Sequence, residues 1–222
     1  MPLRKYFFLL LVGLLSITQQ VWADHTTKYD AIFLYQQIEA SETINFDAFK
    51  QAVEGYNQLE TAKNHLLTII DFSKASTEER LYVIDLEKKN ILFQSHVAHG
   101  RNSGGNLATS FSNTNGSYQS SLGFYRTAET YQGRNGYSLR LDGLEPEIND
   151  NARSRAVVIH GAAYANPEGV DKRGRLGRSF GCPALPQKLN RPIIDTIKNG
   201  SILFIYAKNR DYETQSQYIS KT

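Results

Sequence analysis

Cysteine, methionine and tryptophan each occur only once among the 222 residues of this sequence. A single cysteine, Cys182, cannot form a disulfide bond within the chain, which excludes a fold held together by internal disulfide bonds. The sequence also has no H-E-x-x-H motif and no cluster of cysteines, so the common zinc motifs are absent. The Cys182 thiol is therefore a passive buried group, a link to another chain or a reactive group.

Long apolar runs are scarce, and the one at the N-terminus has the pattern of a secretory signal peptide. Arg4 and Lys5 precede an apolar run over residues 6–15, and residues 21–23 offer a small-residue cleavage site. The run is shorter than the ~20 residues that a membrane-spanning helix needs, although an uncleaved anchor stays an alternative. We expect cleavage before Asp24 and secretion, with no stable membrane span afterwards.

An excess of charge of one sign is also missing. The formal net charge is +3, and it becomes +1 without residues 1–23, which contain Arg4 and Lys5 but no acidic residue. A net charge this small says little about nucleic-acid or membrane partners, and we expect no nucleic-acid partner. About 200 residues remain, which is enough for one domain with a hydrophobic core of its own. We expect a monomer.

The hydrophobic pattern predicts a helical prefix followed by a mostly β (α+β) domain. Residues 24–63 look helical, with Asn45 as a candidate N-cap before apolar residues at spacings of three and four. Strands are predicted over residues 66–72, 81–86, 91–98, 122–126, 137–141, 156–160 and 202–206. A helix is predicted over residues 186–198, a functional or mobile loop over 100–117, and a polar tail after Lys208.

The residue pattern around Cys182 indicates a cysteine nucleophile. The cysteine lies in a glycine-rich turn, and an upstream apolar run ends in His160 and Gly161. Because the thiolate is the nucleophile and a free thiol has a pKa of ~8.5, the site needs a base, which we predict to be His160. The Gly161 carbonyl is the candidate that orients its imidazole. The N–H groups of Phe180, Gly181 and Cys182 are candidates for an oxyanion hole.

Two other catalytic motifs are less consistent with the sequence. Residues 177–181 fit the G-x-S-x-G nucleophile elbow, but no histidine follows His160, as that order requires. Ser179 is therefore expected to shape the turn or to bind substrate. Gly100 and Gly105 have the spacing of a phosphate-binding loop, but Asn106 stands where lysine is required.

A metal site is not expected either. His96 and His99 are three residues apart, which on a strand places their side chains on opposite faces. A zinc site formed by His99 and His160 stays an alternative, but His99 is otherwise expected to line the site.

Several cations lie close to the cysteine and histidine motifs, and two interpretations of them stay open. They are either solvated loop residues or arginine forks for substrate carboxylates. The set consists of Arg153, Arg155, Lys172, Arg173, Arg175 and Arg178.

At these residues the chain resembles the L,D-transpeptidase catalytic domain family (YkuD-like), which remodels peptidoglycan in the bacterial envelope. The family carries histidine-glycine at a strand end and a serine-histidine-glycine-cysteine turn, and the counterparts here are residues 160–161 and 179–182. Phe180 stands where the family has histidine. The pattern of a divergent branch also fits residues 98–100, residues 116–123, Tyr164 and residues 174–184. The resemblance covers roughly residues 66–206.

The resemblance implies an L,D-transpeptidase-like β-sandwich or barrel with one or two packed helices. It implies a periplasmic enzyme without metal or organic cofactor, whose partners are peptidoglycan stem peptides. The expected organisation is a signal peptide over residues 1–23, a helical extension over 24–63, the catalytic domain over 64–208 and the tail over 209–222. Expected substrate-binding residues are Ser179, Arg178, Arg175, Tyr164 and His99.

The implied mechanism is acyl transfer. Cys182 attacks the carbonyl of an L-configured centre in a stem, and His160 takes the thiol proton and later protonates the leaving D-alanine. An amine of a second stem then resolves the thioester. An L,D-carboxypeptidase or amidase that uses water is the alternative with the same residues. A catalytically silent wall-binding module, in which Phe180 marks lost activity, is a third.

Overall fold

The computed structural model describes residues 28–38, 43–59, 65–170 and 174–220. The expected signal peptide and its cleavage site lie outside these residues. None of the helices in the described part of the chain combines the length and the apolar character that crossing a membrane requires.

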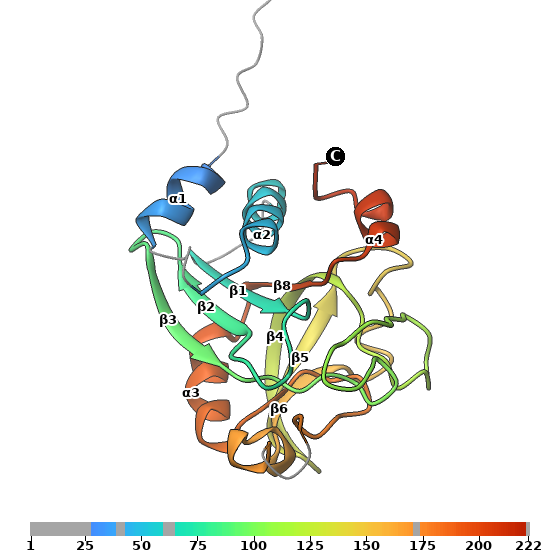
Figure 1. The fold of residues 1–222 in the computed structure, drawn as a ribbon. Coiled ribbons are helices and arrows are strands. Elements are labelled where there is room, and N and C mark those ends of the chain that lie inside the picture. Colours follow the sequence, from blue (N-terminus) through green and yellow to red (C-terminus); the bar gives the residue numbers. More distant parts are fainter. Residues whose placement is uncertain (1–27, 39–42, 60–64, 171–173, 221–222) are drawn as a thin grey trace, which may run out of the picture.

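Eight strands form a single sheet with the order β3-β2-β1-β8-β4-β5-β6-β7, which confirms the mostly β fold (Figure 1). The strands are β1 (Leu66–Asp71), β2 (Leu81–Asp85), β3 (Asn90–Ser95), β4 (Gly123–Gly133), β5 (Gly136–Gly143), β6 (Val158–Gly161), β7 (Ala184–Leu185) and β8 (Ile202–Tyr206). An isolated bridge between Ala98, just after β3, and Ala184 in β7 joins the two edges of the sheet. The sheet is therefore nearly closed.

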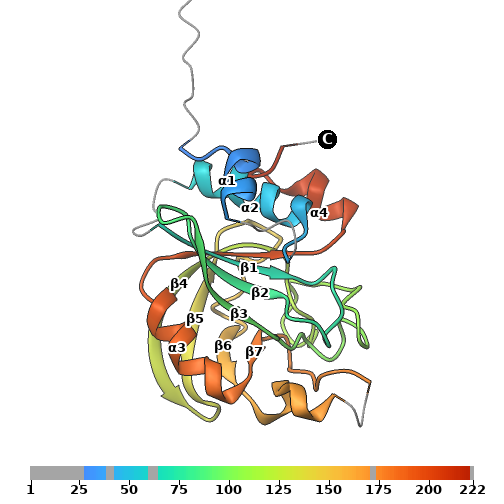
Figure 2. The ribbon, with the colours of Figure 1, turned by 60° about the vertical axis from the view of Figure 1, so that its left-hand side comes forward.

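The helices cover the sheet from two sides. They are α1 (Ala31–Gln37), α2 (Phe46–Gln58), α3 (Gln187–Ile197) and α4 (Arg210–Gln215). Figures 1 and 2 show α1, α2 and α4 at one end of the molecule and α3 on the opposite side. Both α2 and α3 match their predicted positions. Asn45 caps α2 by accepting hydrogen bonds from the N–H groups of Asp47 and Ala48, as its position predicts.

Apolar burial explains why most elements were predictable. All five residues of β8 are buried, and so are the side chains of Phe49, Val53 and Tyr56 on the inner face of α2. Their apolar side chains drive packing between α2 and the central strands β1 and β8.

Three parts of the fold differ from the sequence prediction. β4 continues to Gly133 because its polar outer half pairs with β5 after a bulge. β7 has only two residues and exists through its pairing with β6 and with Ala98. The segment expected as a polar tail contains α4, which buries Tyr212 under its polar surface.

Candidate active site

Strand pairing places the histidine and cysteine motifs side by side. β6 carries His160 and runs parallel to β7, with His160 opposite Ala184. Cys182 lies two residues before Ala184 and therefore runs alongside Val158, at the start of β6. The Val158 N–H lies within hydrogen-bonding reach of the Cys182 thiol.

His160 is buried and held by its own strand. Its Nδ1 lies 3.2 Å from the carbonyl oxygen of Gly161. Because a carbonyl oxygen only accepts, Nδ1 carries the proton in this contact and the Nε2 lone pair is left for proton transfer. Burial lowers the pKa of His160 below its ordinary value, and the Gly161 contact opposes that shift. The imidazole is therefore a neutral base at pH 7.

Cys182 is half-buried, and its thiol is held close to the backbone of the residues before β6. The Sγ lies 3.6 Å from the carbonyl oxygen of Ala156, which has a left-handed backbone with φ of 55°. Burial raises the pKa of the thiol, whereas the Val158 N–H, the Arg155 charge and the Cys182 N–H oppose the rise. In this arrangement the thiol is turned toward Ala156, and no hydrogen bond joins it to His160.

A network of hydrogen bonds shapes the turn that carries the cysteine. Ser179 Oγ donates to the Cys182 carbonyl oxygen at 2.6 Å and accepts from the Gly181 N–H at 3.0 Å. Gly181 has φ of 125°, and an added Cβ there would lie 2.8 Å from the Gln119 carbonyl oxygen. Only glycine fits this close approach. Ser179 is thus buried inside the turn, and the Gly181 N–H is committed to it.

Arg155 connects the site to the loop that was predicted to be functional or mobile. Its guanidinium donates four hydrogen bonds to one segment of that region. The acceptors are Ser112 O, Ser117 Oγ, Gln119 O and Ser121 Oγ. Its positive charge also favours the Cys182 thiolate. From the sequence, Arg155 could not be told apart from the other cations near the motifs, because its contacts come from a segment more than thirty residues away.

Replacing Arg155 with methionine should make the Cys182 thiol less acidic. We expect its alkylation rate at pH 8 to fall by roughly threefold to tenfold, which corresponds to losing about 1 kcal/mol of attraction between the two charges. The measurement is the pH profile of iodoacetamide labelling, whose midpoint should move upward. Arg155→Lys should keep most of the effect of the charge.

Arg153→Met is the matched control for this experiment. That side chain pairs with Glu129 and Asp142 at the surface. The Arg153→Met substitution should therefore leave the midpoint of Cys182 labelling unchanged. An unchanged midpoint in Arg155→Met as well would contradict the electrostatic role.

Of the expected substrate-binding residues, Tyr164 is the one whose phenol interacts electrostatically with the cysteine. It lies in the short 3-10 helix Ala163–Ala165 and is partly buried. Burial, followed by the charge of Cys182, raises the pKa of its phenol to about 12. The close packing of Gly177 against Tyr164, whose Cβ would lie 2.4 Å from a Cβ added at Gly177, fixes the start of the cysteine loop. The structure thus brings Tyr164 and Cys182 together.

The other expected substrate-binding residues contact the protein itself. Arg178 Nη1 donates to the carbonyl oxygens of Arg101 and Gly104. Arg175 Nη1 donates to the Leu176 carbonyl oxygen and is partly buried. Lys172 and Arg173 lie outside the described residues.

His99 is 1% exposed, and its ring points into the interior rather than toward the site surface. Its Nδ1 accepts a 2.8 Å hydrogen bond from the buried Arg80 guanidinium. Burial, and then the Arg80 charge, lowers the pKa of His99 to about 4. The His99 carbonyl oxygen accepts from the Ser179 N–H at 2.9 Å. His99 therefore contributes to the site through its backbone, which holds the cysteine turn.

The comparison with family models decides the classification. The L,D-transpeptidase catalytic domain model matches residues 40–206, most of the chain. The chain belongs to this family. The match confirms the resemblance, and it begins within the stretch expected as a helical extension, before α2.

The similar solved structures have low sequence identity to this chain, and several of them are L,D-transpeptidases. One from Mycobacterium smegmatis is 12% identical with a TM-score of 0.43, and covers 65% of this chain and 59% of its own. L,D-transpeptidase 3 from Mycobacterium tuberculosis is 12% identical with a TM-score of 0.41, covering 65% and 62%. A helical cell shape determining protein from Campylobacter jejuni is 13% identical with a TM-score of 0.44, covering 72% and 55%.

This chain therefore spans less than two thirds of the length of each of these proteins. A comparison with curated protein sequences finds no match.

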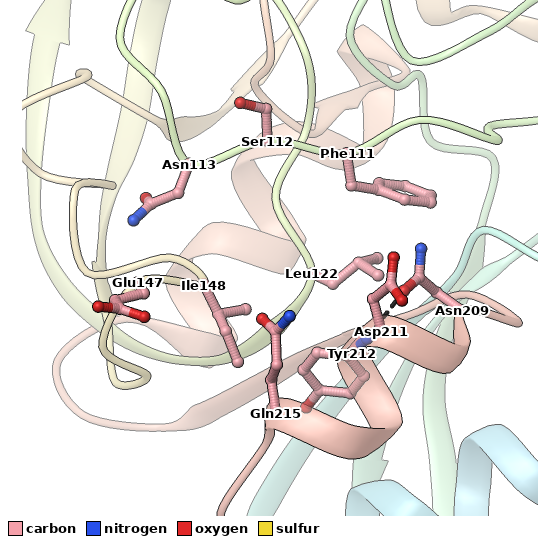
Figure 3. A pocket seen from close by; sticks show the side chains of 10 residues that line it. All are labelled: Phe111, Ser112, Asn113, Leu122, Glu147, Ile148, Asn209, Asp211, Tyr212 and Gln215. Carbon is pink, nitrogen blue, oxygen red and sulfur yellow. Dashed lines mark hydrogen bonds between the residues drawn. The ribbon is translucent and has the colours of Figure 1, made fainter.

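Two further features concern metal binding and the position of a pocket relative to the site. Within the described ranges, no group of three or more His, Cys, Asp or Glu side chains is placed to hold a metal ion. A pocket of about 220 Å³ lies away from the cysteine turn, between the loop around Ser112, the Glu147–Ile148 segment and α4 (Figure 3). None of the predicted site residues lines that pocket.

Proposed function

We propose that this chain is a peptidoglycan L,D-transpeptidase in which Cys182 is the nucleophile and His160 the general base. One observation carries the proposal: the parallel pairing of β6 with β7 holds the cysteine turn beside the strand that carries the histidine. Membership of the L,D-transpeptidase catalytic domain family supports the substrate class.

The two reacting groups start as a neutral pair, because burial lowers the pKa of His160 and raises the pKa of Cys182. Substrate binding turns the thiol from the Ala156 carbonyl toward His160 Nε2. Catalytic hydrogen bonds often form only in the substrate complex, so their absence from the substrate-free structure does not contradict this mechanism. Sγ then bonds to the carbonyl carbon of the L-configured centre as its proton passes to Nε2.

The oxyanion that forms needs N–H donors aimed at it. Cys182 supplies its own N–H, and Phe180 a second, since none of the described residues accepts a hydrogen bond from the Phe180 N–H. The Gly181 N–H, which the sequence also suggested, stays with Ser179 Oγ and holds the turn.

Collapse of this intermediate breaks the bond to D-alanine, and His160 gives its proton to the leaving amine. A thioester on Cys182 results. An amine of a second stem attacks it and His160 again takes the proton. The thiolate then leaves, and His160 returns this proton to it, which regenerates the thiol and the neutral imidazole. The Gly161 carbonyl keeps the imidazole oriented through both half-reactions. Tyr164 lines the path of the stem, whereas Ser179, Arg178 and His99 support the turn beneath it.

The cell-wall substrate is consistent with export, and we propose that the chain acts in the periplasm after removal of residues 1–23. Detection of a mature N-terminus at Asp24 in a periplasmic extract would support this location.

The activity is tested by incubating the protein with purified tetrapeptide muropeptides and identifying products by mass spectrometry. Cross-linked dimers that disappear with Cys182→Ala would support transpeptidation. Tripeptides alone would identify a carboxypeptidase. If the folded protein forms neither product, the proposed activity is wrong.

A further inference from the structure

Three exposed side chains are stacked next to the cysteine turn. Phe180 is 67% exposed, more than any other large hydrophobic residue in the described part of the chain, and Tyr118 is 39% exposed. Arg101 Cζ lies 4.3 Å from the Tyr118 ring centroid and 4.8 Å from that of Phe180. The two ring centroids are 5.1 Å apart. We call this group the Arg101 stack.

The backbone fixes where the Arg101 stack stands. The Arg101 N–H donates to the Ser179 carbonyl oxygen at 2.8 Å, which joins it to the cysteine turn. The Tyr118 carbonyl oxygen accepts from the Asn102 N–H at 3.2 Å. Tyr118 also has φ of 55°, a left-handed conformation that is uncommon for a bulky residue, so the surrounding loop holds its backbone in place.

The charge of the Arg101 stack is available to a ligand. No described carboxylate forms an ion pair with the Arg101 guanidinium, whereas the nearby Arg178 and Arg155 donate to carbonyl or hydroxyl oxygens of the protein. The Tyr118 and Phe180 rings are neighbours that contact the guanidinium from adjacent directions, because their centroids are only 5.1 Å apart. The Arg101 side chain is exposed, so N–H groups turned away from the rings are open to a ligand. A planar fork of N–H donors at an exposed edge fits a carboxylate in a bidentate manner.

We propose that the Arg101 stack binds the terminal carboxylate of the donor stem peptide, while the Tyr118 and Phe180 rings contact its aliphatic part. The inference rests on the proposed function, because that function places the attacked carbonyl at Cys182. In a tetrapeptide the terminal carboxylate is one residue beyond the attacked carbonyl, about 4 Å further along the chain from Cα to Cα. Phe180 lies two residues from Cys182, and Arg101 is bonded to Ser179 of the same turn, so the stack borders the nucleophile on the side where we place the end of the donor stem.

The inference also gives Phe180 a role. The family has histidine at this position, and a phenylalanine here provides an apolar face for the guanidinium instead of a second polar ring. On this view, the departure from the family turn serves recognition of the donor stem rather than marking lost activity.

Binding of two ligands to a Cys182→Ala background tests the inference without turnover. One ligand is a stem tetrapeptide ending in D-alanine, and the other is the same peptide with a C-terminal amide. Calorimetry should show that the acid binds more tightly than the amide. Arg101→Gln should weaken binding of the acid by about tenfold or more, the usual effect of losing a hydrogen bond to a charged group. Binding of the amide should change little.

Three more variants separate charge, shape and packing. Arg101→Lys should keep part of the preference for the acid, and Phe180→Leu should lose part of it. Arg134→Gln, the same change at an exposed arginine in the turn between β4 and β5, should preserve it. Unchanged thermal unfolding midpoints would show that the folds are intact.

The inference is overturned if the Arg101→Gln protein keeps the acid-to-amide ratio, or if the Cys182→Ala protein binds neither ligand. Product formation by the unmodified protein is read separately. If the protein makes products but the Arg101→Gln substitution does not change the preference for the acid over the amide, the proposed function stands and only this subsite is wrong. A protein that makes none, yet prefers the acid through Arg101, loses the proposed function and retains the subsite.

Discussion

Replacing Cys182 with serine should reduce turnover of stem peptides by about 1,000-fold or more. The hydroxyl has nearly the same shape, but it is a far weaker nucleophile at neutral pH than a thiol, and His160 alone has to deprotonate it. Losses of this size are usual when the nucleophile of a catalytic pair is removed. The measurement is kcat/KM for product formation from a tetrapeptide stem, followed by mass spectrometry.

The same substitution should leave the fold intact. The side chain is half-buried, and the hydrogen bond that its thiol donates is the long 3.6 Å contact to the Ala156 carbonyl oxygen. We therefore expect a change of less than about 1 kcal/mol in the free energy of unfolding, as for most substitutions outside the core. A serine variant with full activity would contradict the role of Cys182 as the nucleophile. If the serine variant is inactive but also unfolded, the Cys182→Ala variant tests that role instead.

The predictable part of the fold is the part whose local sequence agrees with its burial. β1 and β8 are apolar runs that become neighbouring central strands, and α2 has both an N-cap and an apolar face. β7 has no such signal, because two residues make no periodic pattern and its pairing partners, Ala98 and β6, are distant in sequence. α4 was missed because one buried residue, Tyr212, anchors an otherwise polar helix.

The residues that we propose to react could be named from the sequence, but the arginines that we propose to act beside them could not. A lone cysteine and a strand-end histidine predict chemistry through their residue types. Arg155 and Arg101 acquire their roles from segments that the nearly closed sheet brings together, as the Gly100–Ser179 bridge illustrates. No local pattern distinguishes them from solvated arginines.

For His99, the sequence suggested a role for the side chain, whereas the structure shows a role for the backbone. Its place at a strand end, beside Gly100, suggested a ring that lines the site. The ring instead packs against Phe72 and accepts from Arg80, both buried, while the backbone of the same residue holds Ser179. The sequence alone does not show which face of a strand end is buried when neither face is purely apolar.

Replacing His160 with glutamine should lower kcat/KM by about 100-fold to 10,000-fold, the range that a general base contributes. Glutamine can still donate to the Gly161 carbonyl oxygen, so the orientation of the chain is kept while the titratable lone pair is lost. His96→Gln is the matched control, since the His96 ring donates to the Thr77 carbonyl oxygen and is not part of the candidate site. It should retain its activity.

The pH profile separates loss of the base from general damage. Neutral His160 is the active form, so activity should fall as the pH drops through its pKa, and burial places that limb below the ordinary value of 6.5. In His160→Gln this limb should vanish, and the residual rate should rise through pH 9 as the thiol itself ionises, because burial raises the Cys182 pKa. A variant that keeps the wild-type acid limb at a lower rate would assign the limb to another group. His160 would then be a positioning residue for Cys182 rather than its base.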